Sequence, residues 1–311
     1  MWGAFRSSPT QRASKKLKPG WVDAPDALRT LDGLSLFEWQ AKGLRELIVD
    51  GFTVLPSMIA PNLCDRVVRD YEQWAKEKAD YVSQNLDELG REKRLVNFHL
   101  ASEAAMAVAT DQHVMELLDL FFGQRSSVYT SLTFKYGTQQ PIHRDTPHFA
   151  TWPPNRFCGV WTALEDVDED AGPLMYIRGG HRFDVDEHNI FHEVESSRGD
   201  LDAEQHAGQA LDVYNGVIMQ TAPENGDFAI APIRKGDVAI WHPQLPHGGS
   251  PANDPQKTRL SMVVHCAPED VQVHQHDRFF THKGPEAPPA RYGLFDSFER
   301  KVAASGETAF M

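Results

Sequence analysis

The sequence has few cysteines and no cysteine pair. Cys64, Cys158 and Cys266 lie far apart, are odd in number and form no CxxC motif. This spacing excludes a disulfide framework and does not support a zinc site built from thiolates. We expect three buried thiols in a reducing compartment, because free cysteine is usually buried.

Long hydrophobic runs are also missing. No apolar stretch approaches the roughly 20 residues that a membrane helix requires, and the N-terminus lacks the apolar core of a secretory signal. The first twenty residues hold five lysines and arginines and no acid, which is typical of a transit peptide or of a short basic arm; the sequence does not distinguish the two. We expect a cytoplasmic protein with no membrane partner.

Positive charge is scarce. The chain has 31 Lys and Arg against 44 Asp and Glu, a formal net charge of -13. Nucleic acids and anionic membranes are usually bound by clustered basic surfaces, so we expect a small-molecule substrate and no nucleic-acid partner. With 311 residues, 41% of them hydrophobic, the chain can bury one large core, and we expect a monomer or homodimer.

Helical periodicity is found in the first part of the chain. Leucine and isoleucine share one face of residues 36–51, which end at a glycine typical of a helix C-terminus. The segment "FTVLPSM" predicts a short strand. A second helix is expected from Pro61 to about residue 80 and a third over roughly 102–122.

From residue 126 onward the pattern changes to short strands separated by Gly, Pro and Asp. The predicted strands lie in "SVYTSLTFKYG", "FCGVWTALEDV", "GPLMYI", "DFAIAPI", "DVAIWHP" and "RLSMVVHC". This spacing is typical of a β-sandwich or barrel, and the preceding helices indicate an α+β domain in which helices buttress a mainly β core.

We therefore expect a single domain over residues 1–311. Its parts are an N-terminal arm (1–35), a helical buttress (36–125), a β core (126–268) with an insertion (182–226), and a C-terminal extension (269–311). The insertion is too polar and irregular for a barrel wall, and we expect it to form a lid over a site.

The segment "HRDTPHF" raises the question of a metal site. In an extended strand His143 and Asp145 point to the same face and Arg144 points away. His247, in "PQLPHGG", is the best candidate for a third ligand. Two histidines and a carboxylate on one side of an ion form the facial triad of non-haem iron oxygenases. Ordinary polar residues at a sheet end are the alternative, because 14 histidines make a partner easy to find.

A second motif supports the metal site. Arg259 lies on a predicted strand in "KTRLSMVV", and Ser261, two residues on, shares its face. A buried arginine needs an anion, and an arginine beside a hydroxyl is well suited to hold a carboxylate by forked hydrogen bonds.

These motifs together resemble the phytanoyl-CoA dioxygenase family of iron(II)- and 2-oxoglutarate-dependent oxygenases. The resemblance covers about residues 50 to 268. It is carried by "DGFTVLPSMIAPNLCDRVVRDYEQW", "HRDTPHF", "VWTALEDVDEDAGPLMYIRGGHRF", "KGDVAIWHPQLPHGGSPAND" and "TRLSMVV". It implies a double-stranded β-helix (a jelly roll, or cupin-like fold) flanked by helices, with iron(II) at its open mouth.

The resemblance also implies roles for individual residues. His143, Asp145 and His247 correspond to the iron ligands. Arg259, with Ser261 beside it, corresponds to the arginine that binds the C5 carboxylate of 2-oxoglutarate, and Trp161 to a tryptophan near that cosubstrate. Gln140 and Lys135 are further candidates for the cosubstrate pocket, although both can equally be polar residues of a strand edge.

Candidate substrate contacts are weaker. His148 and Trp152 follow the proposed ligand pair, and Tyr176 lies in a later strand. Arg178 and His181 belong to "IRGGH", where the family usually has Pro-Gly-Ser-His, so Arg178 either meets an anionic substrate or lies on the surface. In the C-terminal extension, His274 and His276 are expected to be solvated.

The implied reaction consumes oxygen and 2-oxoglutarate, releases succinate and carbon dioxide, and hydroxylates or otherwise oxidises an unactivated C–H bond of a small metabolite. Halogenases of this kind replace the carboxylate ligand with a small residue, so Asp145 favours hydroxylation. A kinase interpretation of "HRD" fails, because position 150 is Ala where a kinase needs Asn. A zinc hydrolase is not supported, because HExxH is absent.

Two alternatives stay open. One is a non-catalytic binding protein of the same fold. The other is a hydroxylase directed at acyl-CoA, which needs a basic patch for the phosphates; Arg156, Arg178 and Arg182 are the cations expected near the mouth.

Overall fold

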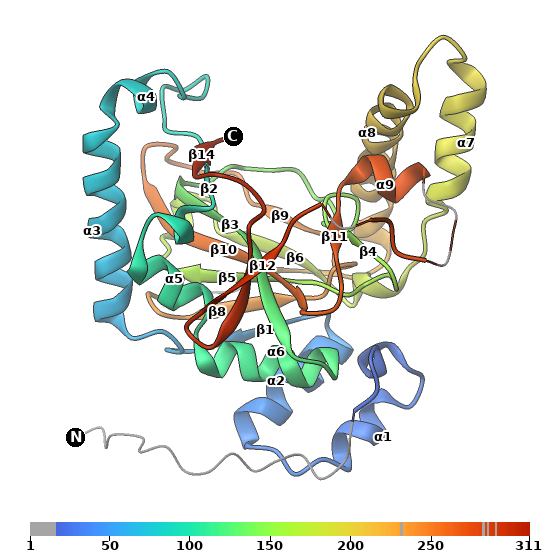
Figure 1. Cartoon of the computed structure of the whole chain (residues 1–311), viewed down its shortest axis with the longest axis horizontal. Coiled ribbons are helices and arrows are strands. Elements are labelled where there is room, and N and C mark those ends of the chain that lie inside the picture. Colours follow the sequence, from blue (N-terminus) through green and yellow to red (C-terminus); the bar gives the residue numbers. More distant parts are fainter. Residues whose placement is uncertain (1–16, 231–232, 282–283, 285, 290) are drawn as a thin grey trace.

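A sheet of nine strands forms the centre of the molecule (Figure 1). The structure is a computed structural model that describes residues 17–230, 233–281, 284, 286–289 and 291–311; most of the predicted basic arm lies outside them. Along the main path of the sheet the strands are β1 (Phe52–Leu55), β8 (Val238–Trp241), β5 (Cys158–Ala163), β10 (Thr258–Pro268), β3 (Ser126–Tyr136), β13 (Arg300–Ala303) and β12 (Leu294–Ser297). Two further strands, β2 (Leu95–Val96) and β14 (Ala309–Phe310), branch off beside β3.

A smaller sheet packs against the large one. It contains β7 (Asp227–Ile230), β6 (Leu174–Arg178) and β9 (His247–Gly249). Tyr176 of β6 shares an apolar cluster with Trp161 of β5 and Trp241 of β8, so side chains of both sheets fill the space between them. Two facing sheets of short strands form the predicted jelly roll. A third, two-stranded sheet pairs β4 (Ala150–Thr151) with β11 (Val273–His274).

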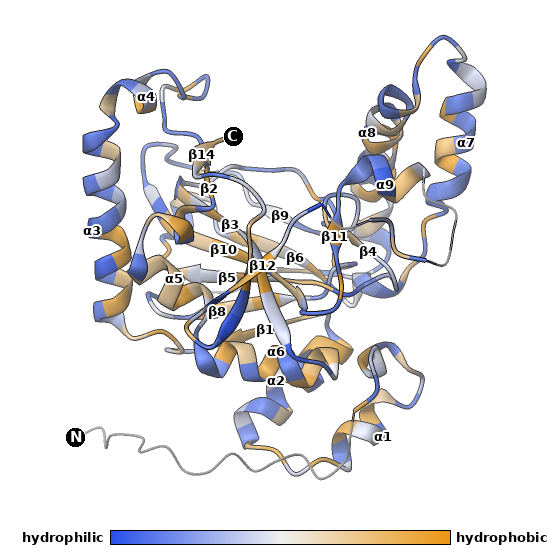
Figure 2. Cartoon of the chain, viewed as in Figure 1, coloured by the Kyte–Doolittle hydropathy of each residue, from blue (hydrophilic) through white to orange (hydrophobic). Residues whose placement is uncertain are grey.

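Side chains that alternate in direction along the central strands pack against apolar clusters on both faces of the large sheet. Val160 of β5 and Val264 of β10 belong to the cluster on the helix-covered face, whereas their neighbours Trp161 and Val263 belong to the cluster between the sheets. Successive strand residues point to opposite faces, and here both faces are apolar. Figure 2 colours each residue of these strands by its hydropathy.

Helices from the first part of the chain cover one face of the large sheet. They are α1 (Ala27–Asp32), α2 (Glu38–Val49), α3 (Pro61–Glu77), α4 (Ala79–Ser83), α5 (Glu103–Ala109) and α6 (Gln112–Phe122). Leu47 of α2 and Leu117 of α6 pack in the same cluster as Val160. The predicted helices at 36–51 and from Pro61 are confirmed.

The prediction of one helix over 102–122 is wrong, because the chain forms two. The Thr110 hydroxyl donates to Met106 O (2.8 Å) at the end of α5, and the Asp111 carboxylate accepts from the N–H groups of His113 and Val114 (3.0 and 3.1 Å) at the start of α6. A capping aspartate satisfies the first free N–H groups of a helix, so Asp111 starts a new one.

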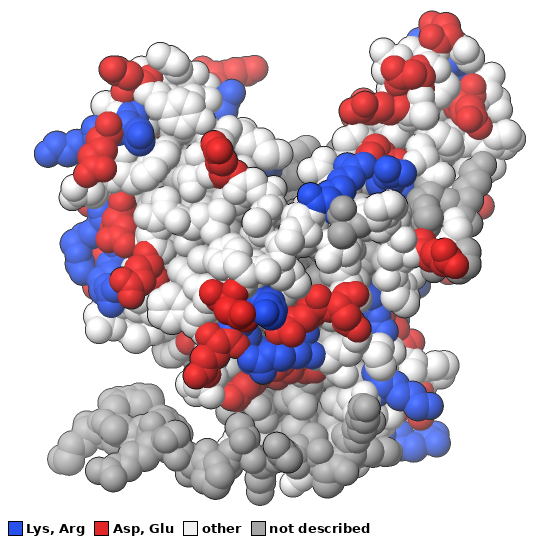
Figure 3. Space-filling view, in the orientation of Figure 1, with Lys and Arg blue, Asp and Glu red and all other residues white. Residues whose placement is uncertain are grey.

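The insertion folds as a helical hairpin, more regular than its composition predicts. Its helices α7 (Glu187–Ser197) and α8 (Ala203–Thr221) pack with α9 (His276–Thr281) around a separate apolar cluster that includes Phe191 and Phe280. Figure 3 shows acidic side chains gathered over this hairpin, while charges of both signs are mixed elsewhere on the same face.

Three smaller predictions concern burial and the membrane. All three cysteines are free and buried, as expected. The expectation that His274 is solvated is wrong, since it is only 1% exposed. Among the described residues, the helices are all too short or too polar to cross a membrane.

The buried His99 makes stability sensitive to acid. His99 is 1% exposed, its Nδ1 lies 2.7 Å from Ser131 Oγ, and burial lowers its pKa from 6.5 to about 4. Between these values the unfolded chain binds a proton that the folded chain does not, so stability present above pH 6.5 is lost as the pH falls towards 4. A pKa difference of this size corresponds to about 3 kcal/mol.

We therefore expect His99→Asn, which keeps a polar partner for Ser131, to reduce the loss of unfolding free energy between pH 7 and pH 5. Urea titrations at the two pH values measure it. His113→Asn is the control, because the His113 side chain is 60% exposed. Equal losses in wild type and His99→Asn would contradict the assignment.

Candidate active site

One pair of backbone hydrogen bonds joins the two halves of the candidate site. His143 N–H donates to His247 O (2.9 Å), and His247 N–H donates to His143 O (3.0 Å). This isolated bridge places the two imidazole rings 4.6 Å apart between centroids. The strand predicted at "HRD" is thus a single bridge. The chain then turns, and Asp145 O accepts hydrogen bonds from the N–H groups of His148 and Phe149 (2.9 and 3.0 Å).

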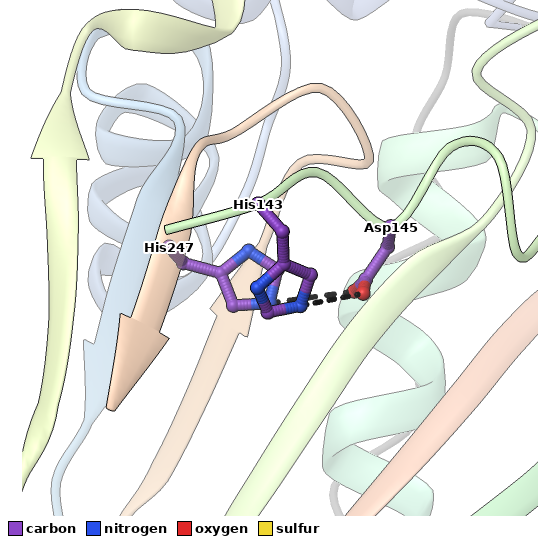
Figure 4. Close-up of side chains that lie close together, drawn as sticks. All are labelled: His143, Asp145 and His247. Carbon is purple, nitrogen blue, oxygen red and sulfur yellow. Dashed lines mark ion pairs between the residues drawn. The ribbon is translucent and has the colours of Figure 1, made fainter. Parts of the chain in front are cut away.

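His143, Asp145 and His247 converge as a possible metal site (Figure 4). One ligand atom from each lies within 4.8 Å of the others. His143 Nε2 lies 3.6 Å from Asp145 Oδ1, and His247 Nε2 lies 3.6 Å from Asp145 Oδ2. The side chains are 12%, 8% and 7% exposed in chain order, so the three groups are shielded from bulk water.

The hydrogen bonds of the two histidines fit a metal. His143 Nδ1 lies 2.8 Å from Pro141 O, and His247 Nδ1 lies 2.9 Å from Leu245 O. A carbonyl oxygen only accepts, so each Nδ1 carries the hydrogen and each Nε2 presents its lone pair towards Asp145. Metal-binding histidines are typically oriented in this way.

The electrostatics favour a cation at the same point. Burial alone would raise the pKa of Asp145, but His247, His143 and His265 hold it well below the usual value. Burial lowers the pKa of His247 to about 4, against the opposing effect of Asp145. At neutral pH the site therefore offers an ionised carboxylate and a neutral imidazole, the forms that bind a metal ion.

Two further side chains hold the Asp145 carboxylate. Trp241 Nε1–H donates to Oδ2 (2.9 Å), and His265 Nε2 lies 3.5 Å from the same oxygen. His265 stacks on Phe149 with ring centroids 3.7 Å apart. No motif marks His265 in the sequence, although strand alternation from Arg259 places it on the same face of β10.

Arg144, between the two ligands, points away from them as the spacing predicts. Its guanidinium donates to Gly180 O (3.0 Å) and Phe183 O (2.7 Å) and lies over the Phe183 ring. It therefore ties the ligand segment to η4 (Gly180–Arg182).

The triad opens into a cavity that contains the buried Arg259. Its Nη1 donates to Gly172 O, while Nε has no partner in the described part of the chain. Burial lowers the pKa of Arg259 to about 10, which still leaves it charged at neutral pH. No carboxylate of the described residues pairs with it, so this cation requires an anion from outside the chain.

Arg94 is a second cation of the cavity wall, and it was not predicted from the sequence. Burial lowers its pKa, and the only charge opposing that effect is Asp145. Across the described residues, its guanidinium has no hydrogen bond or ion pair. Arg94 comes before β2, a strand too short to be predicted, and no motif marks it.

Three of the remaining predicted residues line the cavity. Trp161 is 1% exposed there, and Gln140 Nε2 lies 3.1 Å from His143 Nε2. His148 is the third, and burial lowers its pKa to about 4.

The other predicted residues lie outside the cavity lining. The Ser261 hydroxyl donates to Arg259 O, and Lys135 pairs with Glu92. Trp152 packs edge-on against His274. The cavity-facing role expected for these residues has no contact to support it.

Three candidate substrate contacts, which belong to β6 and the turn after it, also lie outside the cavity lining. Arg178 is exposed and pairs with Asp50 (2.6 Å). His181 packs against His242, and burial lowers its pKa to about 3. Tyr176 is fully buried and stacks on Phe52.

The insertion contributes no residue to the cavity lining either. The hairpin packs on α9, and a lid formed by residues 182–226 stays a prediction.

A jelly roll with a two-histidine, one-carboxylate site and a buried arginine defines the class of iron(II)- and 2-oxoglutarate-dependent oxygenases. The comparison with protein families agrees. The phytanoyl-CoA dioxygenase (PhyH) family matches residues 48–261, and the chain belongs to this family.

Curated relatives are similar over much of the chain. The peroxisomal phytanoyl-CoA dioxygenase of Mus musculus is 23% identical over 292 residues, which cover 86% of this chain and 79% of that protein. The Bos taurus protein of the same name is 28% identical over 143 residues, 46% of this chain and 37% of its own length.

Solved structures share the fold. EctD from S. alaskensis, crystallised with 2-oxoglutarate and 5-hydroxyectoine, has a TM-score of 0.58 at 15% identity, covering 83% of this chain and 86% of EctD. The epimerase SnoN, in complex with Fe3+, alpha ketoglutarate and nogalamycin RO, has a TM-score of 0.57 at 16% identity, covering 90% and 99%.

The Trp241 hydrogen bond predicts an effect on metal affinity. Trp241→Phe keeps most of the ring volume but removes the donor to Asp145 Oδ2. We expect iron(II) affinity to fall roughly 10- to 100-fold, the usual cost of losing a hydrogen bond that orients a ligand. Anaerobic calorimetry measures it, with Trp39→Phe as the control because Trp39 packs against His113 outside the cavity. Unchanged affinity in Trp241→Phe would show that this hydrogen bond does not orient Asp145.

Proposed function

We propose that the protein oxidises an unactivated C–H bond of a small molecule, using iron(II), 2-oxoglutarate and oxygen and releasing succinate and carbon dioxide. One observation carries the proposal: a buried triad that presents one carboxylate and two Nε2 atoms shares a cavity with a buried arginine that has no anionic partner among the described residues. A metal cation would bind the triad, and a dicarboxylate would pair with the arginine.

His143, Asp145 and His247 would hold the iron through Nε2, a carboxylate oxygen and Nε2. A ferrous ion held by three protein groups on one side keeps positions for other ligands, and it supplies oxygen activation coupled to decarboxylation of the 2-oxo acid. The protein contributes a preset orientation, because backbone carbonyls fix both imidazoles and Trp241 fixes the carboxylate.

Arg259 and Arg94 would hold 2-oxoglutarate. A dicarboxylate has two negative groups, and these two guanidinium groups are the cations that line the cavity among the described residues. Charge-assisted hydrogen bonds to carboxylates are strong and directional, and arginine forms them in pairs. Trp161 and Gln140 complete the wall beside them.

A small metabolite is the substrate class that this cavity supports better than an acyl-CoA. The three arginines expected to receive phosphates are engaged elsewhere: Arg178 pairs with Asp50, Arg182 bonds Ile48 O, and Arg156 lies against Gly20. None of them lines the cavity. The similar structures EctD and SnoN are named with 5-hydroxyectoine and with nogalamycin RO, which are not CoA thioesters.

The proposed product is a hydroxylated compound, since Asp145 is present as a ligand. A purely binding protein of the same fold is the second candidate, and turnover of 2-oxoglutarate distinguishes the two. For location we propose the cytoplasm, because three free buried thiols fit a reducing compartment; the Mus musculus relative is named as peroxisomal.

Asp145→Ala tests the metal role. Removing the only carboxylate of the triad leaves two imidazoles, so we expect iron(II)-dependent succinate release from 2-oxoglutarate to fall to the level without enzyme. Mass spectrometry of succinate, with and without a pool of candidate metabolites, measures it. Asp212→Ala, an exposed position on α8, is the matched control and should keep wild-type turnover. Wild-type succinate release by Asp145→Ala would exclude this residue as an iron ligand.

Arg259→Met tests the cosubstrate role separately. We expect the half-saturating 2-oxoglutarate concentration to rise about 10- to 100-fold, because charge-assisted hydrogen bonds of roughly 1.5–3 kcal/mol are lost. The melting temperature without cosubstrate should not fall, because the variant removes a buried charge that has no counter-ion. Arg125→Met, whose parent side chain is 54% exposed, is the control. An unchanged half-saturating concentration in Arg259→Met would refute the role.

A further inference from the structure

Met311 lies at the opening of the cavity. Among the residues that line the cavity, Thr138 and Met311 are the two that are exposed, and Met311 is 64% exposed. The cavity wall beside them includes Arg94 and Phe134. The exposed members of a cavity wall mark its rim, so Thr138 and Met311 border the route from solvent to the triad.

The segment before Met311 is firmly attached. Residues of β14 pair with β2, Ala309 with Val96 and Phe310 with Leu95, and Met311 N–H donates to Arg94 O (3.0 Å). The Phe310 ring packs edge-on against Trp74. Figure 1 shows this last segment crossing from β13 to its place beside β2. The backbone at Met311 is therefore fixed, while its side chain stays in solvent.

A second hollow adjoins the cavity at the same point. Arg94, Phe134, Thr138 and Met311 line both, and the outer hollow continues to Tyr136. Met311 thus stands where the inner cavity and the outer hollow meet. A methionine side chain is flexible and apolar and can adopt several positions at such a border.

We propose that Met311 is the residue that selects by size what enters the cavity, with the primary substrate passing it and leaving its outer part in the adjoining hollow. This inference rests on the proposed function. Met311 contributes selectivity and no chemistry, because it is not among the side chains that can hold the metal, and its thioether carries no charge that could bind a carboxylate.

A residue that borders an entrance changes the rates of entry and exit together. For a ligand held wholly inside the cavity, such as 2-oxoglutarate, it leaves the affinity nearly unchanged, because neither the free nor the bound state gains or loses a contact at the rim. A residue that contacts the ligand changes the affinity instead. The two roles are therefore separable by kinetics.

The test uses full-length protein loaded anaerobically with iron(II), with Met311→Ala to widen the opening and Met311→Trp to narrow it. Met219→Ala is the matched control, since Met219 is 50% exposed on α8 and does not line the cavity. The two ligands are 2-oxoglutarate and the larger, rigid pyridine-2,4-dicarboxylate. Stopped-flow absorption of the iron–ligand complex gives association and dissociation rates, and circular dichroism checks the fold.

We expect both rates to rise severalfold in Met311→Ala and to fall severalfold in Met311→Trp, with little change in Kd and with a larger effect for the bulkier ligand. Rates equal to those of Met219→Ala, a changed Kd at constant association rate, or equal effects on both ligands would each overturn the inference. A wild-type protein that forms no iron–2-oxoglutarate complex would instead refute the proposed function.

Discussion

The reciprocal backbone bridge between His143 and His247 is the contact on which the site depends. These residues lie far apart in the sequence, and no side-chain contact alone would fix both imidazoles at one point. Pairing of β9 with β6 places His247 opposite Tyr176, and the bridge then places His143 beside it. A shift by one residue would turn His247 to the other face of its strand, because strand side chains alternate. The metal site is thus a consequence of strand register.

The same site holds two buried charges of opposite sign, and the fold tolerates both. Asp145 is buried and ionised, and it is stabilised by Trp241 and the neighbouring imidazoles. Arg259 is buried and charged, and its Nε has no hydrogen-bond partner within the part of the chain that the structure describes. Buried charges without partners reduce stability, so a fold retains them where a ligand will complete them. The surrounding apolar layers, from α2 and α6 to the central strands, supply the stability that the site itself lacks.

Short sequence patterns predicted much of the fold, because each reflects the local geometry of a strand or helix. The two-residue spacing of His143 and Asp145 and the alternation of Val160 and Trp161 follow from the period of a strand. The break at Asp111 was missed because helical periodicity continues across it, and only the capping side chain shows the boundary. Trp152 and His181 lie away from the cavity because the chain turns after Asp145 and after β6, and a turn direction is not readable from spacing.

Arg94 and Met311 were beyond prediction for a different reason: each reaches the cavity beside a strand of two residues, β2 or β14, whose pairing is decided by tertiary packing. We therefore expect enzymes of this family to differ at the entrance of the cavity. The family match spans residues 48–261 and contains the triad, Arg94 and Arg259, whereas β12, β13, β14 and Met311 lie after it. The residues proposed to hold iron and 2-oxoglutarate therefore lie inside the match, and Met311, which lines the cavity, lies in the chain that follows it. If Met311 borders the entrance as proposed, substitutions in that segment would change selectivity without moving the three proposed metal ligands.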